Sequence, residues 1–224
     1  MKAVILAAGL GGSLGMGDIP KCLMKVGNQT LIEILVDKLN RAGIKDIILI
    51  IGKNGEKVKE VLGDKVTYCV QNKPLGTAHA VMCVKNFIND PFFMVMNGDI
   101  YFNDTLIDMI GLRPPTIATY WVEDTSKYGR LFIKSGKLVE IKEKVPEMTS
   151  GLINAGIYIF PKGIFDLIKS TPLSPRGSYE ITDTIKMLIE RGVVFKIHKM
   201  RGFWRDIATI DDLRGVEKNI TKIV

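Results

Sequence analysis

The sequence has few cysteines and no long apolar run, and each shortage excludes a class of protein. Its 224 residues include three cysteines, Cys22, Cys69 and Cys83, and no Cys-x-x-Cys pair. An odd number without metal-ligand spacing argues against a zinc site or a disulfide framework, so we expect reduced, semi-buried thiols. No run approaches the ~18 apolar residues of a membrane span. The run AVILAA after Lys2 is too short for a signal peptide. We therefore expect a soluble, cytoplasmic protein without a membrane partner.

Two familiar phosphate-binding fingerprints are also incomplete. The glycine-rich stretch GLGGSLGMGDIPKCL, residues 9–23, follows an apolar run. Leu14 stands where the third glycine of GxGxxG belongs, and no GK[ST] completes a Walker A loop. A nicotinamide dehydrogenase and a P-loop NTPase are therefore disfavoured. Backbone N–H groups of such a loop can still approach phosphate oxygens, and Lys21, held by Pro20, supplies a point charge at its end.

The composition is typical of a globular chain, and the positive net charge favours an anionic ligand. The formal net charge is +7, and 46% of the residues are apolar. Because the lysines are spread along the chain, we expect a solvated surface and no nucleic-acid groove. A small phosphorylated ligand needs only a few of these cations.

Apolar β-branched runs alternate with helical patterns in the first half of the chain. The patterns predict strands at 3–7, 46–51, 66–70 and 92–96, and helices at 30–43, 55–63 and 77–88. In the second half they predict strands at 116–123, 129–141, 152–161 and 193–200, and helices at 163–168, 179–192 and 209–220. We expect one Rossmann-like α/β domain over residues 1–224. Its central sheet is mostly parallel with added antiparallel strands, and helices cover both faces.

Two acidic clusters stand near predicted strands. Asp99 ends VMNGD (95–99), and Asp206 lies in GFWRDIA (202–208) after an aromatic pair. A carboxylate just past a buried strand commonly holds a divalent metal on phosphate oxygens. For Asp99, capping a helix that follows is an equal alternative. Two separated aspartates and one lysine are what Mg²⁺-dependent phosphate chemistry needs.

An ordered set of motifs over nearly the whole chain resembles a known family. In order stand AVILAAGLG…PKCL, QNKPLGTAHAV (71–81), NGD (97–99), EK (143–144), LINAGIYIFP (152–161), YEITD (179–183) and GFWRDIATIDDL (202–213). The set resembles the sugar-1-phosphate nucleotidyltransferases. It is most similar to the glucose-1-phosphate thymidylyl- or uridylyltransferase type and to the pyrophosphorylase domain of N-acetylglucosamine-1-phosphate uridyltransferases.

The resemblance implies a GT-A-like fold and a reaction of nucleotide-sugar biosynthesis. A nucleotidyl group passes from a pyrimidine NTP, UTP or dTTP, to a sugar 1-phosphate, giving NDP-sugar and pyrophosphate. Such a catalyst positions two anions and needs no protein nucleophile. His79 and His198 are therefore expected to be structural. The family also implies a homo-oligomer, although no interface is readable in the sequence.

The resemblance also implies roles for individual residues. Lys21, Asp99 and Asp206 are similar to the phosphate-binding lysine and the two Mg²⁺ carboxylates. The residues that resemble nucleotide contacts are Leu6, Ala8, Gly9, Gly11, Gly12, Ser13, Gln71 at the pyrimidine edge, Gly76 and Thr77. Those that resemble contacts to the sugar phosphate are Gly129, Glu143, Lys144 and Asn154.

One departure keeps two alternatives open. Ser13 stands where the family usually has an arginine that clamps the triphosphate, and a hydroxyl supplies no charge. The chain could be a catalytically impaired regulatory paralogue that binds nucleotide sugars, or a cytidylyltransferase for inositol or choline phosphate. An active enzyme is favoured because the chain keeps the charged residues of the family's motifs, namely Lys21, Asp99, Lys144 and Asp206. Because the sequence ends at Val224, we expect no C-terminal hexapeptide-repeat β-helix.

We predict that Ser13→Arg raises kcat/KM, because a guanidinium would restore charge stabilisation at the triphosphate. One such contact is worth about 2–4 kcal/mol. Pyrophosphate release in the presence of Mg²⁺ is the measurement, and an unchanged or lower kcat/KM would contradict the prediction.

Overall fold

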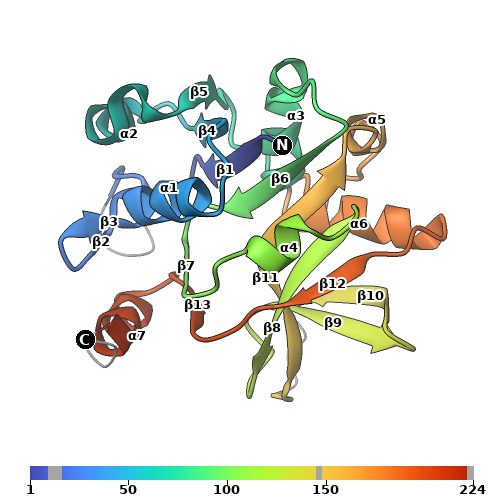
Figure 1. The fold of residues 1–224 in the computed structure, drawn as a ribbon. Helices are drawn as coiled ribbons and strands as arrows, with labels where there is room; N and C mark the ends of the chain where they lie inside the picture. Colours follow the sequence, from blue (N-terminus) through green and yellow to red (C-terminus); the bar gives the residue numbers. More distant parts are fainter. Residues whose placement is uncertain (10–16, 145–147, 221–224) are drawn as a thin grey trace.

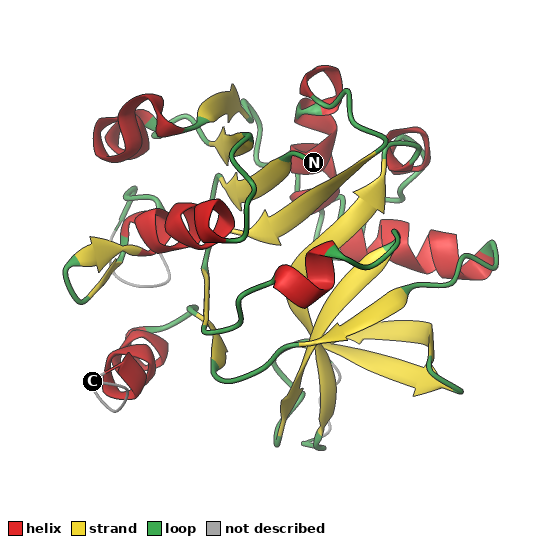
Figure 2. Ribbon diagram, viewed as in Figure 1, coloured by secondary structure: helices red, strands yellow, loops and turns green. Residues whose placement is uncertain are grey.

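The computed structural model describes residues 1–9, 17–144 and 148–220, which form an alternating α/β structure (Figures 1 and 2). Gly11, Gly12 and Ser13 lie outside these ranges. Buried, β-branched runs of the first half form strands, as their propensity favours. These are β1 (Ala3–Ala7), β4 (Ile47–Ile51), β5 (Thr67–Val70) and β6 (Phe92–Asn97). The helices between them are α1 (Leu31–Arg41), α2 (Glu56–Leu62) and α3 (Thr77–Cys83).

The start of α1 shows how local sequence sets an element. The Thr30 hydroxyl accepts a hydrogen bond from the Glu33 N–H (3.4 Å), and the Glu33 carboxylate accepts one from the Thr30 N–H (2.8 Å). This reciprocal capping satisfies two N–H groups that the helix itself leaves without partners. Past the helix, Gly43 adopts φ 84°, where glycine is favoured, and the chain turns toward β4.

The second half adds antiparallel strands to the parallel ones. Its main-sheet strands are β8 (Thr116–Val122), β9 (Gly129–Lys134), β10 (Lys137–Glu143), β11 (Gly151–Pro161) and β12 (Lys196–Lys199). Its helices are α4 (Ile107–Ile110), α5 (Ile164–Ile168), α6 (Ile181–Glu190) and α7 (Ile210–Ile220).

The nine-stranded sheet has the order β10-β9-β11-β6-β1-β4-β5, with β8 beside β11 and β12 beside β8. The β6, β1, β4 and β5 strands are parallel, and β11 runs antiparallel to β6 and to β8. The predicted fold class is therefore confirmed, and the described residues contain no β-helix.

Helices cover both faces of this sheet, as predicted (Figure 1). One apolar cluster joins the sheet to α1, α2 and α4, and a second joins it to α3, α5 and α6. All three cysteines carry free thiols, and burial raises the pKa of Cys22 to about 12. Within the described ranges, no helix has both the length and the apolar character needed to cross a bilayer.

The sequence patterns missed two small antiparallel pairs. The hairpin of β2 (Lys25–Val26) and β3 (Gln29–Thr30) precedes α1. A ribbon of β7 (Ile100–Phe102) and β13 (Trp204–Asp206) stands apart from the main sheet, next to α7 (Figure 1). The alternative that Asp99 caps a following helix is therefore wrong, because a strand follows it. Helix α3 is also shorter than predicted, since it ends at Cys83 and a 3-10 turn at 85–87 follows.

We predict that Gly98→Ala destabilises the protein by about 1–3 kcal/mol, the range for overpacking. A Cβ at Gly98 would lie 2.7 Å from the Leu6 carbonyl oxygen and 3.2 Å from the Ala7 Cα, so β1 would have to move. Urea unfolding measures the loss. The matched control is Gly163→Ala, where nothing lies within 4 Å of the new Cβ. An equal effect of both substitutions would contradict the prediction.

Candidate active site

A cleft of about 280 Å³ lies at the carboxyl ends of the parallel strands β1, β5 and β6. This edge is where open α/β sheets bind ligands. Asn97 and Asp99, at the end of β6, belong to its wall. Six of the residues predicted to contact the nucleotide also line it: Leu6, Ala8, Gly9, Gln71, Gly76 and Thr77.

A second cleft, of about 210 Å³, adjoins the first. The two share Thr77, Asn97 and Glu180 in their walls. All four residues predicted to contact the sugar phosphate line the second cleft, namely Gly129, Glu143, Lys144 and Asn154. Asp206 lines it as well. Apart from Lys21 and the residues outside the described ranges, the predicted site residues thus line two adjoining clefts.

Lys21 closes the glycine-rich stretch and reaches toward Asp99. Its backbone N–H donates to the Gly9 carbonyl (3.1 Å), which joins the two ends of the stretch. Its Nζ lies 3.8 Å from the Asp99 Oδ2, and both side chains keep some exposure, 22% and 33%. The preceding Pro20 is buried, as the prediction of a proline-held lysine requires. The Lys21 cation therefore lies in the same small cavity as Gly9 and Asp99.

The ribbon brings Asp206 opposite Asp99 although they are far apart in the sequence. Asp206 pairs with Ile100 in the ladder, and the Ile207 N–H donates to the Asp99 carbonyl oxygen (2.8 Å). Burial raises the pKa of Asp99, an effect that Lys21 partly opposes. Burial, followed by the negative charge of Asp99, raises the pKa of Asp206 to about 7.

This pair fits a magnesium ion shared with a substrate. Mg²⁺ typically takes one or two carboxylates and completes its shell with water and phosphate oxygens. Nowhere in the described ranges do three or more His, Cys, Asp or Glu side chains gather as metal ligands. Asp99 and Asp206 would therefore hold the ion together with phosphate oxygens, and its charge would relieve the repulsion between them.

Gln71 presents one end of its amide to the nucleotide cleft. Its Nε2 donates to the Gly76 carbonyl (3.1 Å) and to the Nδ1 of His79 (2.9 Å). Because Nε2 carries two hydrogens, both are engaged, and His79 helps to fix the orientation of the Gln71 amide. Within the described part of the chain the Oε1 is left without a protein donor.

The sugar-side residues hold one another in place. A Cβ at Gly129 would lie 2.9 Å from the Glu143 carboxylate, so the absence of a side chain makes room for that group. Asn154 donates from Nδ2 to the Tyr158 hydroxyl (2.7 Å), and its Oδ1 accepts from the Gly156 N–H (3.1 Å). Lys144 has φ 48°, an uncommon conformation for a side chain-bearing residue that clusters at functional sites.

Sequence reasoning missed residues that both clefts share. Asn97 and Glu180 lie inside the quoted motifs NGD and YEITD, yet no role was predicted for either. Arg176, which lines the second cleft, pairs with Glu180 at 3.3 Å. The one sequence feature that pointed to Glu180 as a site residue is its position in the YEITD motif, directly before α6.

A larger groove, of about 920 Å³, runs between β10 and α6 and shares Glu143, Lys144, Arg176 and Glu180 with the second cleft. It lacks Asp99 and Asp206, which line the two smaller clefts, and Lys21, which lines a small cavity together with Asp99.

Comparison with known proteins gives a consistent likeness. The sequence model of a family described as nucleotidyl transferase matches residues 2–223. The bifunctional protein GlmU of Methanococcus maripaludis is 36% identical over 232 residues, which cover 100% of this chain and 56% of that protein. The low-salt glycan biosynthesis nucleotidyltransferase Agl11 of Haloferax volcanii is 34% identical over 228 residues, which cover 95% of this chain and 64% of the relative.

A solved structure from Bacillus anthracis, described as a glucose-1-phosphate thymidylyltransferase in complex with sucrose, has a TM-score of 0.87. It is 31% identical, with 97% of this chain and 94% of that chain covered. The chain thus spans somewhat more than half the length of the curated relatives above.

We predict that Asp206→Asn changes how stability depends on pH. An unfolded Asp ionises near 3.8, whereas Asp206 in the folded protein ionises near 7. Between these values the folded state binds more protons, so this group lowers stability as pH rises. The free energy of unfolding of the variant should therefore rise relative to wild type from about pH 4 to about pH 7, then stay level.

Urea unfolding with a metal chelator, at a series of pH values, measures this difference. A difference between variant and wild type that does not change with pH would show that Asp206 ionises like an ordinary surface aspartate.

Proposed function

The chain belongs to the nucleotidyl transferase family, as its ordered motifs predict, and from that premise we propose that it makes nucleotide sugars. In the proposed reaction a pyrimidine NTP, UTP or dTTP, gives its nucleotidyl group to a sugar 1-phosphate, and pyrophosphate leaves. The observation that carries the proposal is the pair of adjoining clefts, which share Thr77, Asn97 and Glu180; Asp99 lines the first cleft and Asp206 the second.

The chemistry is a displacement at the α-phosphorus. An oxygen of the sugar phosphate forms a bond to that phosphorus, and the bond to the oxygen bridging to the β-phosphorus breaks, which releases pyrophosphate. Both reactants are anions, so the protein must screen their repulsion and align them. Lys21 beside Asp99 and Lys144 in the second cleft would supply the positive charge for this. Mg²⁺ on Asp99 and Asp206 would supply charge neutralisation at the phosphate oxygens.

The orientation of Gln71 supports uracil or thymine as the base. With both amide hydrogens engaged, its Oε1 can only accept a hydrogen bond. The N3–H of uracil and thymine is a donor, whereas N3 of cytosine is an acceptor. If Oε1 faces N3 of the base, cytosine would leave two acceptors facing one another and could pair with Oε1 only by shifting to present its 4-amino group, so this contact favours uracil or thymine over the base of a cytidylyltransferase.

The names of similar proteins support the sugar half of the proposal. The relative from Bacillus anthracis is described as acting on glucose 1-phosphate, and the one from Haloferax volcanii as acting in glycan biosynthesis. The second cleft offers fixed polar partners for hydroxyls, namely Glu143 and Asn154.

We predict that kcat/KM for UTP or dTTP exceeds that for CTP by about tenfold or more, because leaving a buried acceptor unpaired costs about 1–3 kcal/mol. Gln71→Ala should narrow this ratio. The neighbouring, exposed Asn72→Ala is the matched control and should leave it unchanged. A ratio that survives in Gln71→Ala would show that another group reads the base.

The direct test is pyrophosphate release with Mg²⁺, crossing four NTPs with sugar 1-phosphates and with inositol and choline phosphates. We expect turnover with a pyrimidine NTP and a sugar 1-phosphate, and a loss of about a hundredfold or more in Asp99→Asn. Lys144→Ala should raise the KM for the sugar phosphate more than that for the NTP. Its control is Lys142→Ala, an exposed residue of β10 two positions before Lys144 that does not line the second cleft.

Two outcomes would overturn the proposal. Nucleotide-sugar binding without turnover would identify a regulatory paralogue, and turnover only with CTP and a non-sugar phosphate would identify the other alternative.

A further inference from the structure

The two proposed metal-binding aspartates are held with unequal firmness. Asp99 follows the central strand β6, and the adjacent Gly98 N–H donates to the Leu6 carbonyl of β1 (2.9 Å). Asp206 lies on β13, a three-residue strand outside the nine-stranded sheet. Its position opposite Asp99 therefore depends on what fixes the ribbon of β7 and β13.

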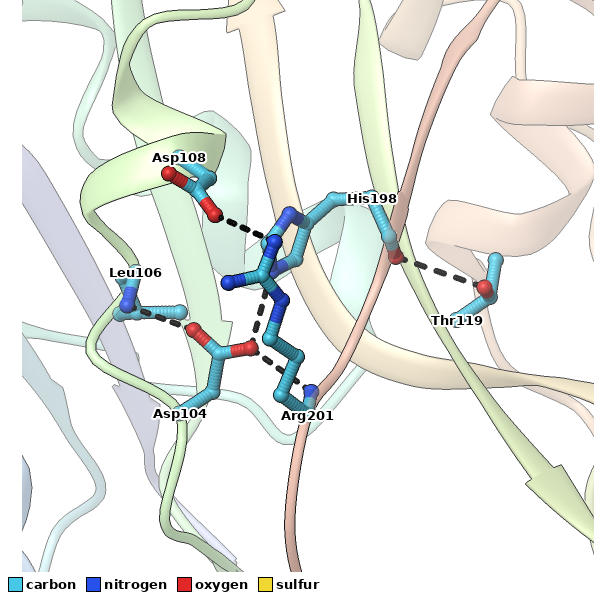
Figure 3. Close-up of polar contacts among 6 residues, drawn as sticks. All are labelled: Asp104, Leu106, Asp108, Thr119, His198 and Arg201. Atoms are coloured by element: carbon cyan, nitrogen blue, oxygen red, sulfur yellow. Dashed lines mark hydrogen bonds and ion pairs between the residues drawn. The ribbon is translucent and has the colours of Figure 1, made fainter.

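A buried polar cluster closes this ribbon at the end away from the aspartates (Figure 3). The Asp104 carboxylate accepts hydrogen bonds from the backbone N–H groups of Leu106 and Arg201, both at 2.8 Å. Its Oδ2 also lies 3.2 Å from the Nε2 of His198, and the two side chains are only 5% and 6% exposed. We call these contacts of Asp104 the ribbon clamp. One carboxylate thus joins the segment after β7 to the segment before β13.

The ribbon clamp also ties the ribbon to the main sheet. His198 belongs to β12, which runs parallel to β8. The Thr119 hydroxyl of β8 donates to the His198 carbonyl (3.3 Å), and the Met200 N–H donates to the Thr119 carbonyl (2.8 Å). Beyond the clamp, the Asn103 N–H donates to the Phe203 carbonyl (2.9 Å), and three ladder pairs then lead to Asp206.

We propose that Asp104, held by His198, is a positioning residue for Asp206 and so for the divalent cation, an inference that rests on the proposed function. Its carboxylate fixes the chain between β12 and β13 and keeps the ladder of β7 and β13 in register. Losing either partner would leave a buried polar group without its hydrogen bond, and the ribbon would relax to satisfy it. Asp206 would move, whereas Asp99 would keep its position after β6.

The test uses Mn²⁺ as the probe metal, titrated into the full chain in the presence of UDP-glucose, whose phosphates supply the remaining ligands, while EPR follows the free ion. Asp206→Asn defines how much of the binding belongs to the site. We expect Asp104→Asn and His198→Phe to weaken that binding about tenfold, at the lower end for residues that orient metal ligands. His198→Gln, which retains an N–H donor, should keep affinity close to wild type.

The matched control is Asp108→Asn, the same chemical change four residues along. Asp108 pairs with the Arg201 side chain at 3.0 Å on the surface, where 62% and 80% of the two side chains are exposed. Such a pair contributes little, so Mn²⁺ affinity should not change. All titrations are run below the melting transition of each variant, which circular dichroism records.

The outcomes separate the inference from the proposed function. If wild type and Asp206→Asn bind Mn²⁺ alike, the metal site of the proposed function is wrong, and the inference fails with it. If Asp206 is needed but Asp104→Asn and His198→Phe bind like wild type and lose only thermal stability, the inference alone is overturned. If Asp104→Asn does not fold, the Mn²⁺ affinities of His198→Phe and His198→Gln are compared instead. Equal affinities of these two variants would overturn the inference.

Discussion

The repulsion between the carboxylates of Asp99 and Asp206 is the constraint on which the site depends. Burial raises the pKa of each carboxyl group, and the negative charge of Asp99 raises that of Asp206 further, so ionising both without a cation is unfavourable. The fold maintains this arrangement with a backbone hydrogen bond from Ile207 to Asp99 and a short ladder beside it. Lys21 relieves part of the repulsion, and a divalent ion on substrate phosphates would relieve the rest. The two carboxylates thus lower the stability of the folded chain at the position where a divalent ion would bind.

Placement of the substrates follows from the topology of the sheet. Parallel strands bring the ends of β1, β5 and β6 to one edge, where the nucleotide cleft forms. The antiparallel strands of the second half wall the adjoining cleft, which contains Glu143 and Asn154. Asn97 and Glu180 line both, so a nucleotide and a sugar phosphate bound there would meet beside them. In the proposed reaction the fold would separate recognition of the two anions while bringing their reacting ends together.

The fold was predictable where sequence pattern is local, and the site only in part. Strand–helix alternation lies within short windows, so most elements were predicted near their true bounds. The β7–β13 ribbon was not, because it pairs residues about a hundred positions apart and each strand has only three residues. The resemblance named Gln71, but only the structure shows that Gly76 and His79 engage both its amide hydrogens. Asn97 and Glu180 were missed because their importance comes from cleft geometry.

The most direct measurement of the central claim is a crystal structure of the chain with Mn²⁺ and the nucleotide-sugar product, using anomalous scattering to locate the metal. The account predicts one strong metal peak bonded to both the Asp99 and Asp206 carboxylates and to phosphate oxygens. The base should lie against Gln71 and the sugar against Glu143. A nucleotide bound in the groove between β10 and α6, or a metal in the nucleotide site that touches neither aspartate, would contradict it.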